Sequence, residues 1–172
     1  MSQEYPYKIG RGMILFAWIL LLLLLTVVFS DFLEHQDNPN QRVEGIKSNG
    51  VRSIELRRNR QGHYVATARI NGKPVTVLLD TGATEVSVPA PVAADLGLDK
   101  GFANQVMTAN GVITVYSTLL DKVEIGNIVL HDVRAHINPN MHNREILLGM
   151  SFLKQLEFSQ QGDTLTITQS GT

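Results

Sequence analysis

The stretch Val75-Thr76-Val77-Leu78-Leu79-Asp80-Thr81-Gly82-Ala83-Thr84 is the part of this chain that indicates its fold. Its first five residues are aliphatic or β-branched, which predicts a buried strand. An acid follows at once, and a glycine two residues later allows the chain to turn sharply. The sequence therefore places Asp80 where a buried strand ends and a tight turn presents its carboxyl group.

A second apolar run, Ile146-Leu147-Leu148-Gly149, also ends on glycine far along the chain. A lone Asp-Thr-Gly is more often ordinary turn chemistry than a reactive site. The aliphatic strand before Asp80, the apolar Val86 and Val88 after it, and the distant run together favour the catalytic interpretation. Asp80 is therefore the candidate catalytic residue.

Carboxyl groups can hydrolyse a peptide bond when two of them share one proton. One group then takes a proton from the attacking water, while the other stabilises the carbonyl oxygen. Close to such a group, Gly82 lets a partner loop approach without a Cβ clash, and the Thr81 hydroxyl can bond across to that loop. A single acid is not enough for this chemistry.

Two other kinds of catalytic site fit the sequence poorly. A zinc site built from His131, His136 and His142 would have ligand spacings that match no helix face, and the chain has no cysteine. A serine nucleophile would need a Gly-x-Ser-x-Gly elbow, and Gly149-Met150-Ser151 lacks the closing glycine. We expect neither a metal nor a cofactor.

Overall charge argues against a nucleic-acid surface, because 15 basic residues are balanced by 16 acidic ones. The basic cluster Arg57-Arg58-Asn59-Arg60 precedes Gln61-Gly62 and is interpreted as a solvated hairpin rather than a binding patch.

An uncharged stretch from Gly12 to Ser30 is long enough for a helix to cross a hydrocarbon core. Lys8 and Arg11 precede it, so the basic-inside bias predicts a cytoplasmic N-terminus, residues 1–12, and a transmembrane helix over residues 13–30. The remainder would lie in the periplasm, anchored to the inner membrane and in contact with the bilayer only through the helix. A cleaved signal peptide is the alternative, although the apolar stretch is longer than a usual signal core.

Residues 31–50 are polar and contain Pro39, and we expect a linker there. Residues 51–172 show short apolar runs separated by turn dipeptides, which predicts a mostly β domain. Short helices are expected after Pro89-Ala90-Pro91, ending at Gly97, and from Gly149 through Leu156. The expected strands are residues 52–58, 63–70, 74–80, 85–88, 104–109, 112–120, 122–126, 128–137 and 164–168.

These motifs resemble the retropepsin-like aspartic proteases, and among them the bacterial membrane-anchored members. The resemblance covers roughly residues 60–170 and includes Thr108-Ala109-Asn110-Gly111 and Ile146-Leu147-Leu148-Gly149-Met150-Ser151-Phe152-Leu153, besides the segment around Asp80. It implies a closed, mostly β barrel or sandwich with one or two short helices, preceded here by the transmembrane helix.

The resemblance also implies roles for individual residues. Asp80 would be the catalytic aspartate, Thr81 and Gly82 would support its loop, and Leu147, Leu148 and Gly149 would form the segment behind it. Residues Thr108, Ala109, Asn110 and Gly111 would form the flap over bound peptide, turning at Asn110-Gly111.

Only one Asp-Thr-Gly is present, so the second acid is expected from a second copy of the chain in a homodimer. Met150 and Ser151 stand where viral members commonly carry a charged pair, which argues against an intersubunit ion pair of that type. The expected function is an aspartic endopeptidase that cuts peptides or proteins near the membrane. The alternatives are a catalytically silent dimeric scaffold with the same fold, and a tethered adaptor that binds peptides without cutting them.

Overall fold

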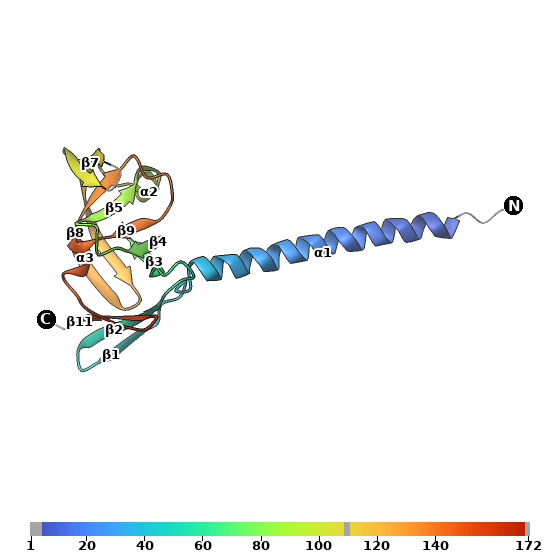
Figure 1. Ribbon diagram of the computed structural model, residues 1–172, viewed down its shortest axis with the longest axis horizontal. Coiled ribbons are helices and arrows are strands. Elements are labelled where there is room, and N and C mark those ends of the chain that lie inside the picture. Colours follow the sequence, from blue (N-terminus) through green and yellow to red (C-terminus); the bar gives the residue numbers. More distant parts are fainter. Residues whose placement is uncertain (1–4, 109–110, 171–172) are drawn as a thin grey trace. The chain divides into compact units, whose positions relative to one another are not determined.

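The computed structural model describes residues 5–108 and 111–170 of the chain (Figure 1). The chain divides into two compact units, Met1–Gln36 and Asp37–Thr172. The first unit is almost entirely helix α1, Tyr5–Asp37, which is longer at both ends than the predicted residues 13–30. Pro39 explains the C-terminal limit, because a proline restricts the residue before it and cannot continue a helix.

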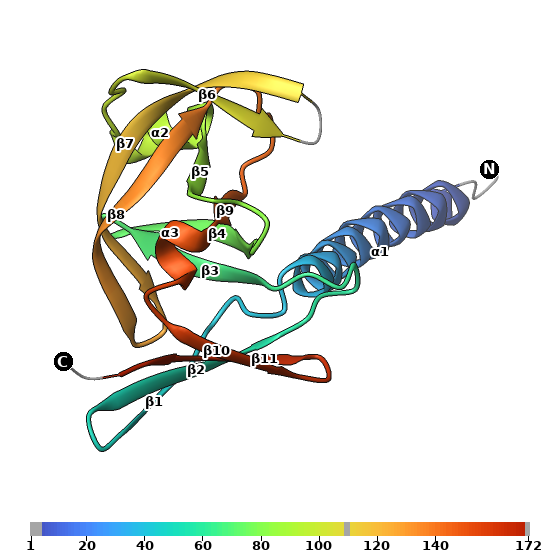
Figure 2. The same ribbon diagram turned by 60° about the vertical axis from the view of Figure 1, so that its left-hand side comes forward.

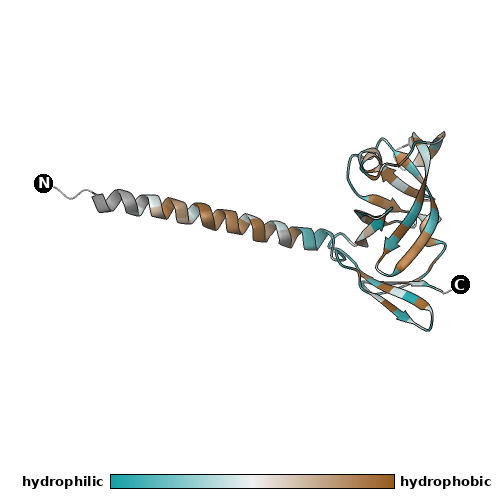
Figure 3. Cartoon of the chain, turned by 180° about the vertical axis from the view of Figure 1, so that it is seen from behind, coloured by the Kyte–Doolittle hydropathy of each residue, from teal (hydrophilic) through white to brown (hydrophobic). Residues whose placement is uncertain are grey.

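Helix α1 contains a segment, Gly12–Asp37, that is long and apolar enough to span a membrane. Figure 3 shows hydrophobic residues along its middle and hydrophilic residues at its C-terminal end. Its large side chains, such as Trp18 and Leu22, are exposed along the helix. A helix that is apolar on all sides is typical either of a membrane span or of the core of a large protein.

The second unit begins with part of a four-stranded antiparallel sheet in the order β1-β2-β11-β10. The strands are β1 Gly45–Ser48, β2 Val51–Arg57, β10 Glu157–Gln161 and β11 Thr164–Gln169. Strand β1 lies inside the predicted linker, residues 31–50, so that segment contains regular structure. Its register with β2 runs from Gly45 opposite Ile54 to Ser48 opposite Val51.

A larger sheet has the order β3-β4-β9-β5-β8-β7-β6, and β3 also pairs with β7. This last pairing closes six of the strands into a barrel (Figure 2). Strand β4 runs parallel to β9, and β5 runs parallel to β8. The strands are β3 Val65–Ile70, β4 Lys73–Leu79, β5 Val86–Pro89, β6 Ala103–Thr108, β7 Gly111–Ile125, β8 Ile128–Asn138 and β9 Ile146–Leu148.

Two short helices complete the mostly β fold that the sequence predicts. Helix α2, Ala90–Leu96, ends at Gly97 in a left-handed conformation, as expected. Helix α3, Met150–Leu153, is one turn long and stops short of the predicted Leu156. The two strands expected over residues 112–120 and 122–126 are one strand, β7, which continues through Asp121.

The hydrophobic core fills the barrel and the space between the barrel and the four-stranded sheet. Side chains from the small sheet, such as Ile54 and Ile167, pack in the same cluster as Val77 of β4 and Phe152 of α3. Strand β4 is attached to this cluster through Val77, which fixes the position of the residues that follow the strand.

Candidate active site

Asp80 directly follows β4, between β3 on one side and β9 on the other. Its backbone N–H donates to the Leu148 carbonyl at 3.1 Å, so the pairing with β9 continues one residue beyond the strand. The chain then turns, and the Ala83 N–H donates to the Asp80 carbonyl at 3.3 Å. The predicted acid at the end of a strand is confirmed, but β4 buries only Val77, and its other residues are half-buried or exposed.

The Asp80 carboxylate is held by its own turn. The Gly82 N–H donates to Asp80 Oδ1 at 2.8 Å, and a Cβ at Gly82 would lie 3.1 Å from the same oxygen. Asp80 is half-buried, whereas Thr81 and Gly82 are exposed. One carboxylate oxygen is thus fixed by the backbone, and the loop is open on the side where a second copy could approach.

Residues after β9 support the loop from behind. The Met150 and Ser151 N–H groups donate to the carbonyls of Ala83 and Thr84 at 2.8 and 3.0 Å. A Cβ at Gly149 would clash with the Glu85 carbonyl oxygen and would lie 2.6 Å from that of Ala83. Glycine is required here because the two backbone segments approach so closely.

Ser151 makes a second connection that the sequence analysis did not find. It is buried, its Oγ accepts a hydrogen bond from the Val86 N–H at 3.0 Å, and the same hydroxyl donates to the Arg134 carbonyl at 2.7 Å. The hydroxyl therefore links α3, β5 and β8 around the Asp80 loop. A hydroxyl in an apolar context was the available signal, but its partners lie on strands far away in sequence.

An apolar surface lies beside the acid. Leu78 pairs with Leu147 in the parallel register of β4 and β9, and both side chains are half-exposed. Side chains alternate along a strand, so Leu78 and Asp80 project from the same face of β4. Leu147 thus lies beside Leu78 on this surface, while its neighbours Leu148 and Gly149 are buried near the loop.

The hairpin of β6 and β7 contains the expected flap residues Thr108 and Gly111. These two residues pair with each other, so the connecting residues are Ala109 and Asn110, both outside the described residues. The predicted turn at Asn110-Gly111 thus includes a residue outside the described ones, and Gly111 is the first residue of β7 with φ of 109°. Near the tip, Met107 and Val112 pair across the strands and are 85% and 59% exposed.

His136 is a half-buried titratable group near the loop. Its Nδ1 lies 3.8 Å from Oε2 of Glu85, five residues after Asp80. Burial lowers the pKa of His136, and the neighbouring Glu85 carboxylate opposes that effect. His131 and His142 are exposed, and within the described residues no group of three His, Asp or Glu side chains is placed to hold a metal ion.

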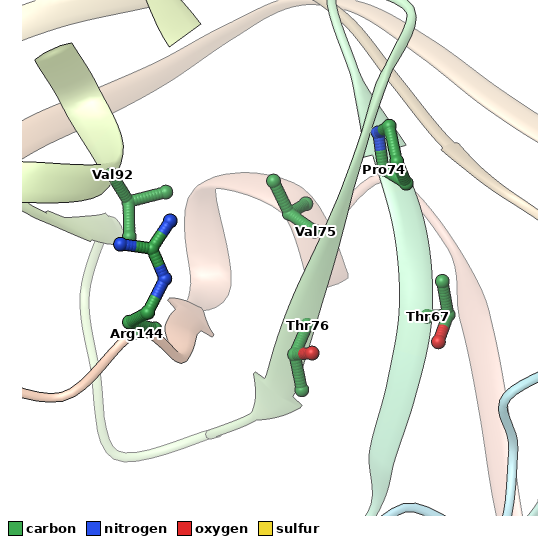
Figure 4. Close-up of a pocket in the computed structure, with 6 residues that line it drawn as sticks. All are labelled: Thr67, Pro74, Val75, Thr76, Val92 and Arg144. Atoms are coloured by element: carbon green, nitrogen blue, oxygen red, sulfur yellow. The ribbon is translucent and has the colours of Figure 1, made fainter. Parts of the chain in front are cut away.

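Two hollows on the β unit lie away from Asp80. The first, of about 240 Å³, is lined by β3, β4, α2 and Arg144, with Val75 and Val92 among its apolar residues (Figure 4). Arg144 is bound to Asp95 of α2 at 2.6 Å. The second, of about 520 Å³, is lined by Lys100, Asp121 and their neighbours. Neither hollow is lined by Asp80 or by the residues of its turn.

Comparison with known proteins identifies relatives along most of the chain. A Sinorhizobium protein described as an uncharacterized protein in the cobV 5′ region is 29% identical over 167 residues, which cover 90% of this chain and 72% of that protein. The uncharacterized protein RP867 of Rickettsia prowazekii is 29% identical over 114 residues, or 64% of this chain. The chain spans about half of that relative, 48% of its length.

A crystal structure of a retropepsin-like aspartic protease from Rickettsia conorii matches with a TM-score of 0.61 and 26% identity, covering 74% of this chain and 96% of that one. The fold is that of a retropepsin-like aspartic protease domain. The family model described as "gag-polyprotein putative aspartyl protease" matches residues 66–155, more than half of the chain. The chain belongs to this aspartyl protease family.

Proposed function

We propose that the protein is an aspartic endopeptidase whose active site forms between two copies of the chain, each contributing Asp80. The observation that carries the proposal is the Asp80 turn, which holds a carboxylate in an exposed loop at the end of a core strand. One Asp-Thr-Gly per chain then requires a two-fold axis to bring two acids together. The family and the fold support a peptidase.

In this proposal the two Asp80 carboxyl groups share one proton. The ionised group takes a proton from water as the water oxygen attacks the peptide carbonyl carbon, and the protonated group gives its proton to the carbonyl oxygen. Collapse of the tetrahedral intermediate breaks the C–N bond. The departing nitrogen takes a proton from the dyad, and a hydroxyl of the intermediate gives one back to it, which restores the single shared proton. The reaction consumes one water and needs no other reactant.

Neighbouring residues have supporting roles. Thr81 and Gly82 lie on the exposed side of the loop and are suited to contact the partner's loop, while Leu148 and Gly149 fix it from behind. The hairpin around Thr108 and Gly111 would close over the peptide and exclude water. The half-exposed Leu78 and Leu147 favour an apolar substrate side chain next to the scissile bond.

Helix α1 would anchor the enzyme, with residues 1–12 in the cytoplasm, residues 13–30 across the inner membrane and the β unit in the periplasm. The support is the apolar segment of α1 and the basic residues Lys8 and Arg11 before it. A reporter that works only outside the cytoplasm, fused after Thr172, should be active, and the membrane fraction should retain residues 1–30. A soluble, shortened product would instead establish a cleaved signal peptide.

The decisive experiment is mass spectrometry of a peptide library incubated with the full chain in detergent. We expect new termini with the wild type and a loss of about 10²- to 10⁴-fold in turnover with Asp80→Asn, which keeps the shape but cannot share a proton. Asp121→Asn is the matched control, since Asp121 is exposed and outside the loop. Equal cleavage by Asp80→Asn would exclude Asp80, and binding without cleavage by the wild type would support the scaffold or adaptor alternatives.

A further inference from the structure

The segment between the apolar helix and the β unit is short and firmly attached. Asp37 and Asn38 are each hydrogen-bonded to the strands and loops that follow. The Asp37 carbonyl accepts from Asn59 Nδ2 at 3.1 Å, and Asn38 Nδ2 donates to Thr67 Oγ1 at 3.0 Å. These contacts begin only seven residues after Ser30, where the uncharged stretch ends. The 20-residue linker expected from composition is therefore a much shorter tether.

Asn40 completes the attachment and is 5% exposed. Its Nδ2 donates to the carbonyls of Val65 at 2.7 Å and Arg57 at 2.9 Å, and its Oδ1 accepts from the Arg57 N–H at 2.7 Å. Its own carbonyl accepts from the Thr67 N–H at 3.0 Å. A buried amide with all of these partners fixes the chain, because freeing it would leave several polar groups unsatisfied.

This attachment lies at the same end of the β unit as Asp80. Asn59 Oδ1 accepts from the His63 N–H at 2.9 Å, and the next residue, Tyr64, accepts at its carbonyl from the Leu79 N–H at 3.0 Å. Asp80 follows Leu79 directly. The path from Asp37 to Asp80 therefore passes through Asn59, His63, Tyr64 and Leu79. Each of its steps joins two hydrogen-bonded or adjacent residues and covers about 4 to 6 Å, so Asp80 lies within roughly 25 Å of Asp37.

Together with the length of chain between Ser30 and Asp37, these contacts limit the distance between Asp80 and the bilayer. The seven residues from Ser30 to Asp37 span about 10 Å as helix and roughly 25 Å if fully extended. Asp80 therefore stays within roughly 35 to 50 Å of the membrane core. An extended polypeptide crosses that distance in about 10 to 15 residues.

From this limit we infer that the enzyme selects substrates by position: it cuts membrane-anchored polypeptides within about 10 to 15 extended residues of the membrane core. The inference rests on the proposed anchored protease and adds a fixed reach to it. Sites that a rigid segment holds farther from the membrane are beyond the reach of the tether, even when their sequence suits the active site.

The test uses full-chain protein in liposomes with single-span reporter proteins. Each reporter carries the sequence cut best in the peptide library, placed either about 8 residues beyond its own span or after a semi-rigid helical spacer of about 60 residues, which holds the far site roughly 90 Å from the membrane. We expect the near site to be cut at least about tenfold faster than the far site. A flexible Gly/Ser insert of about 20 residues between Gln36 and Asp37 should reduce that ratio to about twofold or less.

The matched control carries the same insert between Asn49 and Gly50, an exposed hairpin tip that lies after the attachment and leaves the tether unchanged. All three proteins should cut the free library peptide equally in detergent. Equal cutting of near and far reporters by the wild type, with normal peptide turnover, would overturn the fixed reach and leave the protease intact. Failure to cut any peptide would instead remove the proposed function on which the inference rests.

Discussion

His136 gives the β unit a pH-dependent stability that can be measured apart from catalysis. Burial lowers its pKa from the ordinary 6.5, so the unfolded chain binds more protons than the folded one once the pH falls below about that value. Stability is therefore complete above that range and decreases toward pH 5. His136→Gln cannot be protonated, and its free energy of unfolding, measured with urea, should depend less on pH between 7 and 5.

The control is His142→Gln at an exposed position, which should keep the wild-type pH dependence. Glu85, 3.8 Å from His136, acts in the opposite direction by favouring the charged imidazole. A wild-type protein that becomes more stable at pH 5 would mean that this carboxylate outweighs burial.

Ser151 tests how the loop around Asp80 is supported. Ser151→Ala leaves the buried Val86 N–H without its acceptor, which should cost about 1 to 3 kcal/mol of unfolding free energy. Ser159→Ala, at an exposed site on β10, should cost almost nothing. Equal unfolding midpoints for the two variants in denaturant would show that water replaces the hydroxyl.

At the scale of elements, the flap hairpin should matter for turnover more than for stability. Gly111 has φ of 109° and is exposed, so Gly111→Val should distort the hairpin tip with little effect on the core. We expect at least about a tenfold loss of kcat/KM with an unfolding midpoint close to that of the wild type. Gly162→Val is the control, because it also places valine at a positive φ, of 59°, in the β10–β11 turn. A similar loss of activity in both variants would argue against a flap at Gly111.

The elements that could be predicted from sequence are those specified by neighbouring residues. The run ending at Leu79, the glycine that closes α2 and the alternation in β8 each identify themselves locally. Strands β1 and β10 could not be predicted, because every residue in them is exposed and no apolar alternation marks them. The contacts of Ser151 and Asn40 also required the folded structure, since their partners are brought together only by strand pairing.

At the scale of the whole molecule, the proposed active site requires two chains, and mixing them provides a direct test. Wild type is combined with an equal amount of Asp80→Asn at fixed total protein, well above the dimer dissociation constant, and subunit exchange is verified. Random pairing leaves about one quarter of the dimers with two aspartates, whereas independent sites would retain about one half of the activity. The measurement is the initial rate on the library peptide.

Any activity of mixed dimers with a single acid would raise the expected one quarter. The control is therefore a covalently linked tandem of one wild-type and one Asp80→Asn chain, which measures the activity of the mixed dimer directly. If the tandem is inactive and the mixture keeps one quarter of the activity, the site is shared between chains. The exposed turn after Asp80 is consistent with that result, since it leaves room for a partner. An inactive tandem with a mixture still at one half would contradict composite pairing. The second acid would then have to be sought within the chain, among carboxylates that the folded unit leaves apart from Asp80.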